Sequence, residues 1–263
     1  MVGKGNKMKM KRIPAIMLSL AFTLLNCPNT FADSTKNTPL PELSGYTAPI
    51  RGINEITNKN VPPMSGAPSA SAPRLAQSGD ITYGDETLLI VGDKLSGCKI
   101  KIWCDGDESV VTPIRSDNNK TEFVIPEKYG QSMIMVWAEK NGKYSNPMRI
   151  NEPVVKWINK DTVYSGEESE IRITGQCFKA EGFQTSVYAV YDDGNIQKLD
   201  ITDCNPYHVR AVLPSDLPAG RKCSIYVHNG TGGEYGWSNA AKVSVIEKRV
   251  LDEDEMKTVN VSD

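Results

Sequence analysis

The sequence predicts an all-β fold built from two tandem β-sandwiches. From residue 80 onward, short runs of β-branched, apolar and aromatic residues alternate with turns rich in Gly, Asn and Asp. No stretch places apolar residues at the three- and four-residue spacing of an amphipathic helix. The strands recur at intervals of about eight to twelve residues, which is typical of sandwiches and not of parallel β-α units.

The expected strands fall into two sets, at residues 80–151 and 152–247, and we expect one sandwich from each set. In the first set the strands are Thr87–Val91, Lys99–Trp103, Thr121–Ile125 and Ser132–Ala138. In the second set they are Val154–Trp157, Ser169–Thr174, Ser186–Tyr191, Val209–Leu213, Cys223–His228 and Lys242–Ile246. Hairpin signals such as Asn141-Gly142 and Asp193-Gly194 separate neighbouring strands.

The two sets are repeats of one plan. Each begins with an acidic turn and an alternating strand, continues to a Gly followed by an apolar residue, and has a late strand that leads into Asn-Gly. The matched segments are Ile81–Leu95 with Thr162–Phe178, Phe123–Pro126 with Ala211–Pro214, and Met135–Gly142 with Ile225–Gly230. Chance seldom produces such agreement over a whole domain.

The first 32 residues are typical of a secretory signal peptide. Five lysine and arginine residues precede Ile13, Ile13–Leu25 is apolar, and Thr30-Phe31-Ala32 supplies the small residues of a cleavage site after Ala32. We therefore expect a secreted, extracellular chain. The alternative is a lipoprotein signal anchored at Cys27, although Asn26 before it is bulky where a small residue is expected.

Two further segments flank the sandwiches. Residues 33–79 are rich in Pro, Ser, Asn and Thr, and this composition buries too little apolar surface to offset the entropy of ordering it. We expect a flexible leader there, whose end adds a first edge strand. Residues 248–263 contain the acidic run Asp252–Glu255, which we expect to be a solvated linker.

Charge and cysteine content exclude several classes of protein. Cleavage after Ala32 lowers the formal net charge from −2 to −7, because five basic and no acidic residues leave. An acidic chain lacks the basic surface that nucleic acid or anionic lipid requires, and no later apolar run approaches the roughly 20 residues of a membrane span. The remaining cysteines are odd in number and contain no C-x-x-C pair, so we expect buried free thiols. They are Cys98, Cys104, Cys177, Cys204 and Cys223.

The glycine-rich loop that closes Leu213–Ser238 is the sharpest signal in the chain. Tyr235 and Trp237 follow glycines in this loop, and His228 and Asn229 stand at the end of the preceding strand. These four residues are candidates for binding a carbohydrate or docking a domain, because an exposed indole can stack on a sugar ring. The competing interpretation is that Trp237 folds back and closes the end of the sandwich, while His228 bonds to the adjacent turn.

The sequence contains no recognisable catalytic, metal or cofactor site. Its only histidines, His208 and His228, lie in no catalytic motif. Gly230–Gly236 lacks the Lys-Ser/Thr ending and the following helix of a phosphate loop, and Asp105–Glu108 has too few spaced oxygen ligands for calcium. The other tryptophans lie in strands with alternating apolar neighbours, so we expect them in the core or between domains. They are Trp103, Trp137 and Trp157.

The strand ending in Gly, the loop with an apolar residue and the late strand ending in Asn-Gly resemble the IPT/TIG branch of immunoglobulin-like domains. This resemblance implies that both sandwiches are immunoglobulin-like. Leu217–Gly220 and Tyr226–Ser238 are together similar to modules that precede the β-helix of secreted pectate-lyase-like proteins, and Thr258–Asp263 resembles the start of such a β-helix. The first repeat departs from this pattern, because Lys-Tyr-Ser-Asn-Pro follows Asn141-Gly142.

The resemblance implies a non-catalytic, secreted module that spaces or docks a polysaccharide-degrading β-helix domain. Weak binding of polysaccharide by the module itself is compatible with this function. The alternative is a stand-alone interaction or adhesion module of the cell surface with no enzyme attached. The expected partners are therefore a polysaccharide and a downstream β-helix domain, with no cofactor, and an enzyme in its own right has the least support.

Overall fold

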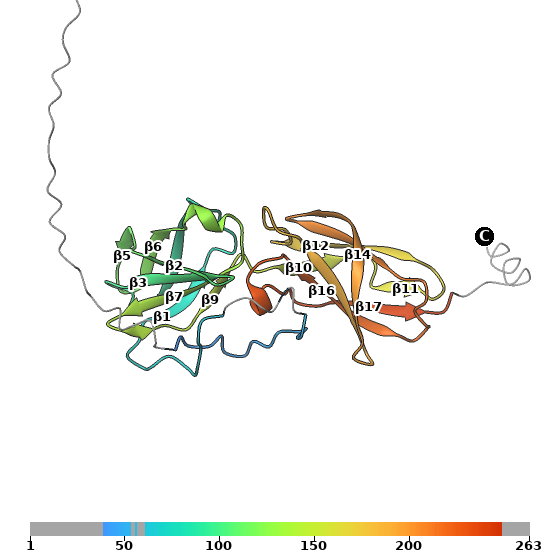
Figure 1. The fold of residues 1–263 in the computed structure, drawn as a ribbon, viewed down its shortest axis with the longest axis horizontal. Coiled ribbons are helices and arrows are strands. Elements are labelled where there is room, and N and C mark those ends of the chain that lie inside the picture. Colours follow the sequence, from blue (N-terminus) through green and yellow to red (C-terminus); the bar gives the residue numbers. More distant parts are fainter. Residues whose placement is uncertain (1–38, 54–55, 57–60, 249–263) are drawn as a thin grey trace, which may run out of the picture. The chain divides into compact units, whose positions relative to one another are not determined.

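The structure, a computed structural model of the 263-residue chain, describes residues 39–53, 56 and 61–248. The expected signal peptide, the alternative anchor at Cys27 and the terminal motif Thr258–Asp263 lie outside these residues. The described residues belong to one compact unit. Their named elements are strands and two 3-10 turns, so the all-β prediction is confirmed (Figure 1).

The strands between residues 74 and 150 form what we call the first sandwich. One sheet has the order β1-β2-β6-β5, and the other has the order β4-β3-β7-β8 with β9 also paired to β7. Side chains such as Ile90, Ile102 and Val136 are fully buried in the core that these strands share. The elements are β1 (Arg74–Ser78), β2 (Thr87–Asp93), β3 (Lys99–Cys104), β4 (Asp107–Val111), β5 (Arg115–Ser116), β6 (Lys120–Val124), η1 (Glu127–Tyr129), β7 (Ile134–Lys140), β8 (Lys143–Tyr144) and β9 (Met148–Ile150).

The strands between residues 154 and 246 form the second sandwich, which has a core of its own. Their order is β10-β12-β15-β14-β13-β16-β17-β11, and β11 runs parallel to β17 while the other pairs are antiparallel. The elements are β10 (Val154–Ile158), β11 (Thr162–Tyr164), β12 (Ser169–Gln176), β13 (Ser186–Tyr191), β14 (Ile196–Asn205), β15 (His208–Leu213), β16 (Lys222–His228), η2 (Gly233–Tyr235) and β17 (Ala241–Ile246).

Strand β14 belongs to both layers of the second sandwich. Residues 196–199 pair with β13, residues 200–205 pair with β15, and the register shifts between Ile201 and Asp203. Such a bulge bends a strand and allows it to pass from one layer to the other. Every expected strand is present with its ends shifted by two residues at most. The strands that were not predicted are β4, β5, β8, β9, β11 and β14, and the last of these has a largely polar sequence.

The first edge strand pairs in the same way in both sandwiches. β1 pairs with β2, and β10 pairs with β12, and a single register shift interrupts each pairing. The shift lies between residues 75 and 77 in β1 and between residues 155 and 157 in β10. The resulting equivalent positions are Leu75 with Val155, Gly92 with Gly175, and Gln77 with Trp157.

An asparagine fastens each of these edge strands. Asn239 Oδ1 accepts a hydrogen bond from Val155 N–H at 2.8 Å, and Asn239 Nδ2 donates to Val155 O at 3.0 Å. Asn146 makes the same two bonds to Leu75, at 3.0 and 2.9 Å. A side-chain amide that both donates and accepts thus mimics a strand partner for one residue of the edge strand.

A serine precedes each asparagine and makes equivalent bonds. Ser145 Oγ accepts from Ala138 N–H at 2.8 Å, and Ser238 Oγ accepts from Val227 N–H at 2.9 Å. Each hydroxyl also donates to the carbonyl of the next residue at 2.8 Å. We call the pairs Ser145-Asn146 and Ser238-Asn239 the Ser-Asn clamps. The Lys-Tyr-Ser-Asn-Pro sequence, which departs from the aromatic loop, therefore contains the part that the repeats share.

The prediction of a flexible leader over residues 33–79 is wrong for the described part of that segment. Leu40 is buried in one apolar cluster with Trp137, and Ile50 is buried in another with Trp237. A few apolar side chains can order a polar segment when a formed surface is available to cover them. The expected first edge strand is present as β1.

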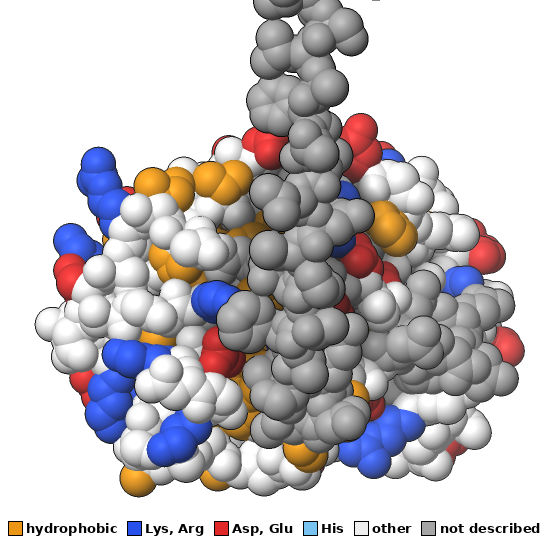
Figure 2. Space-filling view, turned by 60° about the vertical axis from the view of Figure 1, so that its left-hand side comes forward, with side chains coloured by type: hydrophobic (Ala, Val, Ile, Leu, Met, Phe, Trp, Pro, Cys, Tyr) orange, Lys and Arg blue, Asp and Glu red, His pale blue; other side chains and the backbone are white. Residues whose placement is uncertain are grey.

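The described surface carries charges of both signs. On the face drawn in Figure 2, lysine and arginine side chains are interspersed with aspartate and glutamate, and hydrophobic patches between them are small. On that face no single sign dominates. No helix among the described residues is long and apolar enough to cross a membrane.

We expect Asn146→Ala and Asn239→Ala to lower the free energy of unfolding by about 1–3 kcal/mol each, since each removes two hydrogen bonds to an edge strand. The loss should be larger for Asn146→Ala, because Leu75 is only 3% exposed whereas Val155 is partly exposed and can rebind water. Urea unfolding measures the difference. Amide exchange should rise in β1 for the first variant and in β10 for the second, and unchanged exchange in both strands would contradict the clamp.

Candidate functional site

The glycine-rich loop after β16 packs on the first sandwich. Gly232 has a φ of 78°, and a Cβ at this position would lie 1.9 Å from Met133 Cε. A side chain there would collide with Met133, so glycine allows the loop to approach the residues just before β7. Residues 233–235 then form the 3-10 turn η2.

Asn229 and Thr231 connect the loop to the first sandwich by hydrogen bonds. Asn229 Oδ1 accepts from Thr231 N–H at 3.1 Å and from Thr231 Oγ1–H at 3.0 Å. Thr231 Oγ1 in turn accepts from Met133 N–H at 2.8 Å. All three residues are fully buried. Asn229 therefore orients the hydroxyl that satisfies a buried backbone donor of the other sandwich.

Both ring nitrogens of His228 form hydrogen bonds with the backbone of the same loop. Its Nδ1 accepts from Gly230 N–H at 3.0 Å, so the other ring nitrogen carries the proton and donates to Gly233 O at 2.7 Å. The side chain is 1% exposed. These bonds agree with the interpretation of His228 as a strand-end residue that bonds to the adjacent turn.

Tyr235 and Trp237 pack in two separate apolar clusters. The Tyr235 ring lies edge-on to Trp103 at 6.3 Å and tilted against Tyr46 at 5.3 Å. The Trp237 ring lies edge-on to Tyr188 at 5.6 Å and to His228 at 4.8 Å. Both rings are buried, at 8% and 1% exposure.

The structure therefore does not offer the four predicted residues to a sugar ring. Asn229 and His228 are as buried as Trp237, and stacking requires an exposed ring face. Trp237 folds back, as the competing interpretation expects. The loop instead contacts the first sandwich and the leader segment.

Arg149 connects β9 to this loop. Its Nη1 donates to Tyr235 O at 3.1 Å, and its guanidinium lies 4.5 Å from the centre of the Tyr46 ring. Arg149 also forms an ion pair with Glu152. Burial raises the pKa of Glu152, and the Arg149 charge opposes that shift. The sequence offered no signal for this arginine, because its partners come from segments far away in the chain.

A hollow of about 350 Å³ lies beside Tyr235. Its lining comes mostly from the leader segment, including Glu42, Tyr46 and Arg51, and from Glu234 of the loop. Tyr46 Oη donates a hydrogen bond of 2.5 Å to Glu234 O across one side of it. The hollow exists because the leader segment packs on the loop.

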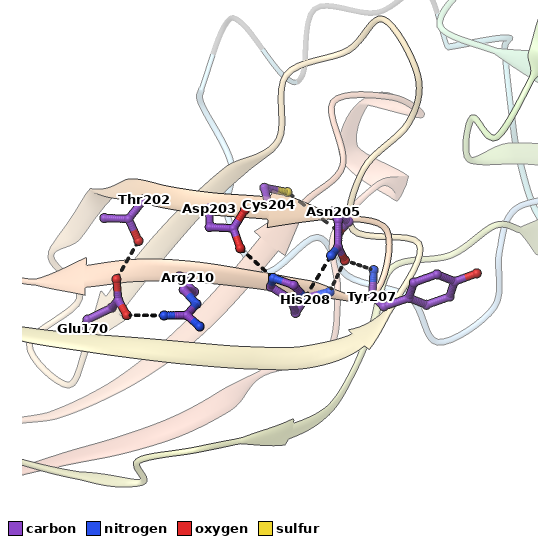
Figure 3. Close-up of polar contacts among 8 residues, drawn as sticks. All are labelled: Glu170, Thr202, Asp203, Cys204, Asn205, Tyr207, His208 and Arg210. Carbon is purple, nitrogen blue, oxygen red and sulfur yellow. Dashed lines mark hydrogen bonds and ion pairs between the residues drawn. The ribbon is translucent and has the colours of Figure 1, made fainter.

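A second group of polar side chains lies on the outer face of the sheet formed by β12, β15 and β14 (Figure 3). His208 Nε2 bonds to Asp203 Oδ2 at 2.7 Å, and His208 Nδ1 lies 3.0 Å from Asn205 Nδ2. Glu170 accepts from Arg210 Nη1 at 3.1 Å and from Thr202 Oγ1 at 2.7 Å. No sequence motif predicted a site at any of these residues.

These contacts favour the ionised form of both carboxylates of the face. The hydrogen bond with His208 lowers the pKa of Asp203. The hydrogen bond from Thr202, followed by that from Arg210, lowers the pKa of Glu170. Glu170 thus stands as a negative charge opposite Arg210, and Asp203 as a negative charge bonded to the His208 ring.

Trp157 does not lie in a core or between domains, which corrects its sequence prediction. It is 57% exposed in edge strand β10, whereas Trp103 and Trp137 are fully buried as expected. Val155 and Ile158 pack partly buried against the core, and the register places Trp157 opposite Thr174, on the open face. A bulge adds one residue to the strand and so moves the following side chains to the other face of the sheet. In a strand of five residues, the alternation of residue types therefore does not predict which side chains face the core.

The five described cysteines are free thiols, and four of them are buried. Burial raises the pKa of Cys104 to about 12 and that of Cys177 and Cys223 to about 11. Within the described ranges, no three His, Cys, Asp or Glu side chains gather as they would around a metal ion.

No protein-family model matches the sequence, and no curated protein matches it. Solved structures with some likeness include the SGBP-B protein of the Bacteroides ovatus mixed-linkage glucan utilization locus, in complex with a mixed-linkage heptasaccharide. It is 13% identical, with a TM-score of 0.27, over 72% of this chain and 50% of that one.

Two more structures show a similar degree of likeness. The surface glycan-binding protein PbSGBP-B from Prevotella bryantii is 18% identical, with a TM-score of 0.27, over 64% of this chain and 41% of its own. The plexin A4 extracellular region is 8% identical, with a TM-score of 0.29, over 67% of this chain and 25% of its own. The chain thus spans half or less of these proteins, and the low TM-scores carry no information on what it binds.

We expect Thr231→Val to lower the free energy of unfolding by about 1–3 kcal/mol, because it leaves the buried Met133 N–H without an acceptor. Hydrogen exchange at the Met133 amide should rise. Thr185→Val is the matched control, since Thr185 Oγ1 bonds at 2.8 Å to Phe178 O within the second sandwich. If Thr185→Val raises exchange at Met133 as much as Thr231→Val does, the hydroxyl bond between the sandwiches has no specific effect.

We expect iodoacetamide at pH 8 to alkylate Cys104, Cys177 and Cys223 far more slowly than a free thiol. The cause is burial, which raises each thiol pKa to about 11 or 12 and so leaves little thiolate. Mass spectrometry of the chain from residue 33 onward measures the labelling, with the protein in guanidinium as the control. Rapid labelling of Cys104 in the native protein would contradict its burial.

Proposed function

We propose that the chain is a non-catalytic module in which two β-sandwiches act as one spacer that holds a further domain or a polysaccharide. The observation that carries this proposal is that the loop after β16 packs against the first sandwich. Thr231, Gly232 and Tyr235 all contact residues before residue 150. A connection made by a linker alone would leave two sandwiches free to reorient.

Both histidines support a structural and not a catalytic role. His228 is buried and uses both ring nitrogens within its own loop. His208 uses both of its ring nitrogens on the outer face of the second sandwich. A general base needs a ring nitrogen that can reach a substrate proton, and neither histidine presents one.

The finer form of the proposal is a module that spaces or docks a polysaccharide-degrading β-helix domain after residue 263. It rests on the resemblance of Leu217–Gly220 and Tyr226–Ser238 to modules that precede such domains. The alternative is an interaction or adhesion module of the cell surface, and the exposed polar face around His208 is the observation that favours it. In both forms the protein acts outside the cell and binds without cleaving.

The spacing function predicts that both sandwiches tumble together. Replacing Thr231–Trp237 by Lys-Tyr gives the second sandwich the hairpin of the first, Asn-Gly-Lys-Tyr-Ser-Asn, and removes the contacts to Met133 and Trp103. Nitrogen-15 relaxation should show one rotational correlation time for the native protein and two shorter ones for this variant. If the native protein and the variant have the same correlation times, the spacing proposal is wrong. If the native protein releases reducing ends from polygalacturonan, the chain is an enzyme.

A further inference from the structure

Trp157 is the exception among the tryptophans. Of the four in the chain, the other three are at most 1% exposed, whereas Trp157 is 57% exposed. Its strand is held in place, because Asn239 binds both backbone polar groups of Val155, two residues earlier. An indole on a fastened strand costs little entropy to order when a ligand covers it.

The sheet register places Trp157 at one end of a row of polar side chains. Trp157 lies opposite Thr174 in β12, Thr174 lies opposite His208 in β15, and His208 lies opposite Asn205 in β14. Adjacent strands are about 4.8 Å apart, so the row extends roughly 14 Å across the sheet. Directly opposite residues point to the same side of a sheet, so these four side chains share its outer face.

A second row beside the first balances its charges. Arg172 lies opposite Arg210, and Arg210 lies opposite Asp203. Glu170, one further place along β12, pairs with Arg210, and Asp203 pairs with His208 (Figure 3). The two acidic residues thus offset the two arginines, so this face attracts neither a polyanion nor a polycation strongly.

We infer that the outer face of β10, β12, β15 and β14 binds an uncharged polysaccharide, with Trp157 stacking on one sugar ring and the neighbouring Thr174 hydroxyl and the carboxylates of Asp203 and Glu170 bonding to sugar hydroxyls beyond it. This inference rests on the polysaccharide-binding part of the proposed function and gives it a surface other than the loop after β16. A pyranose ring has an apolar face bordered by hydroxyls, which matches an indole beside fixed donors and acceptors.

The first sandwich provides the internal comparison. The position equivalent to Trp157 is Gln77, which lies opposite Val91, and Val91 lies opposite Lys120. That row has no aromatic side chain and no histidine. The face is therefore particular to the second sandwich, although both edge strands are fastened by the same Ser-Asn clamp.

Affinity electrophoresis and iodide quenching of tryptophan fluorescence test the inference. The probes are a soluble β-glucan, an arabinoxylan, a galactomannan and an α-glucan, with polygalacturonan as the charged comparison. At least one neutral probe should retard the native protein and protect Trp157 from iodide. Trp157→Ala should weaken binding about tenfold at an unchanged melting temperature, since the side chain is largely exposed. Thr174→Val should weaken it less, and the matched control Gln77→Ala should leave it unchanged.

Three other results would contradict the inference. Equal retardation of native protein and Trp157→Ala would place binding elsewhere, with the hollow beside Tyr235 as the next candidate, and would leave the proposed function standing. Failure of all neutral probes to bind would overturn polysaccharide binding altogether, while joint tumbling of the sandwiches would still support spacing. Protection of Trp157 by rising protein concentration alone would show that the face joins two copies of this chain.

Discussion

The interaction on which most of this structure depends is the pair of hydrogen bonds between an asparagine side chain and one residue of an edge strand. Asn146 and Asn239 each satisfy both the N–H and the C=O of a residue just before a register shift. Unpaired edge groups would otherwise be free to exchange with water or with another chain. Because the serine before each asparagine also binds a strand of the opposite sheet, β7 in the first sandwich and β16 in the second, the clamp joins the two sheets of each repeat at one point.

The same clamp explains how the repeats came to differ without losing their fold. In the first sandwich the chain passes from Asn141-Gly142 to Ser145 through two residues, whereas in the second it passes from Asn229-Gly230 to Ser238 through seven. The longer loop starts and ends at equivalent points, so it adds no strain to either sheet. It is used to bring Thr231 and Tyr235 against the first sandwich.

Much of the fold was readable from the sequence, and the candidate sites were not. Strand positions were predicted within two residues because apolar and β-branched residues alternate and Gly-Asn turns separate them. Five short strands and the long strand β14 were not predicted. With β14 the sequence missed Asp203 and Asn205, since a strand that passes between layers lacks a regular alternation. Trp157 was assigned to the wrong environment, because the strand tryptophan expected in a core is exposed. Of the two interpretations of Trp237, burial at the end of the sandwich agrees with the structure, and exposure for binding does not.

The sequence alone determined the all-β class, the repeat and the places of the turns, because these follow from the local pattern of apolar, polar and glycine residues. The tertiary structure alone decided which aromatic rings face solvent, that Leu40 and Ile50 order the leader segment, and that Ser-Asn is the shared element of both repeats. Burial depends on which surface another segment covers, and that surface is formed by residues up to roughly two hundred positions apart. No local pattern encodes such a distance.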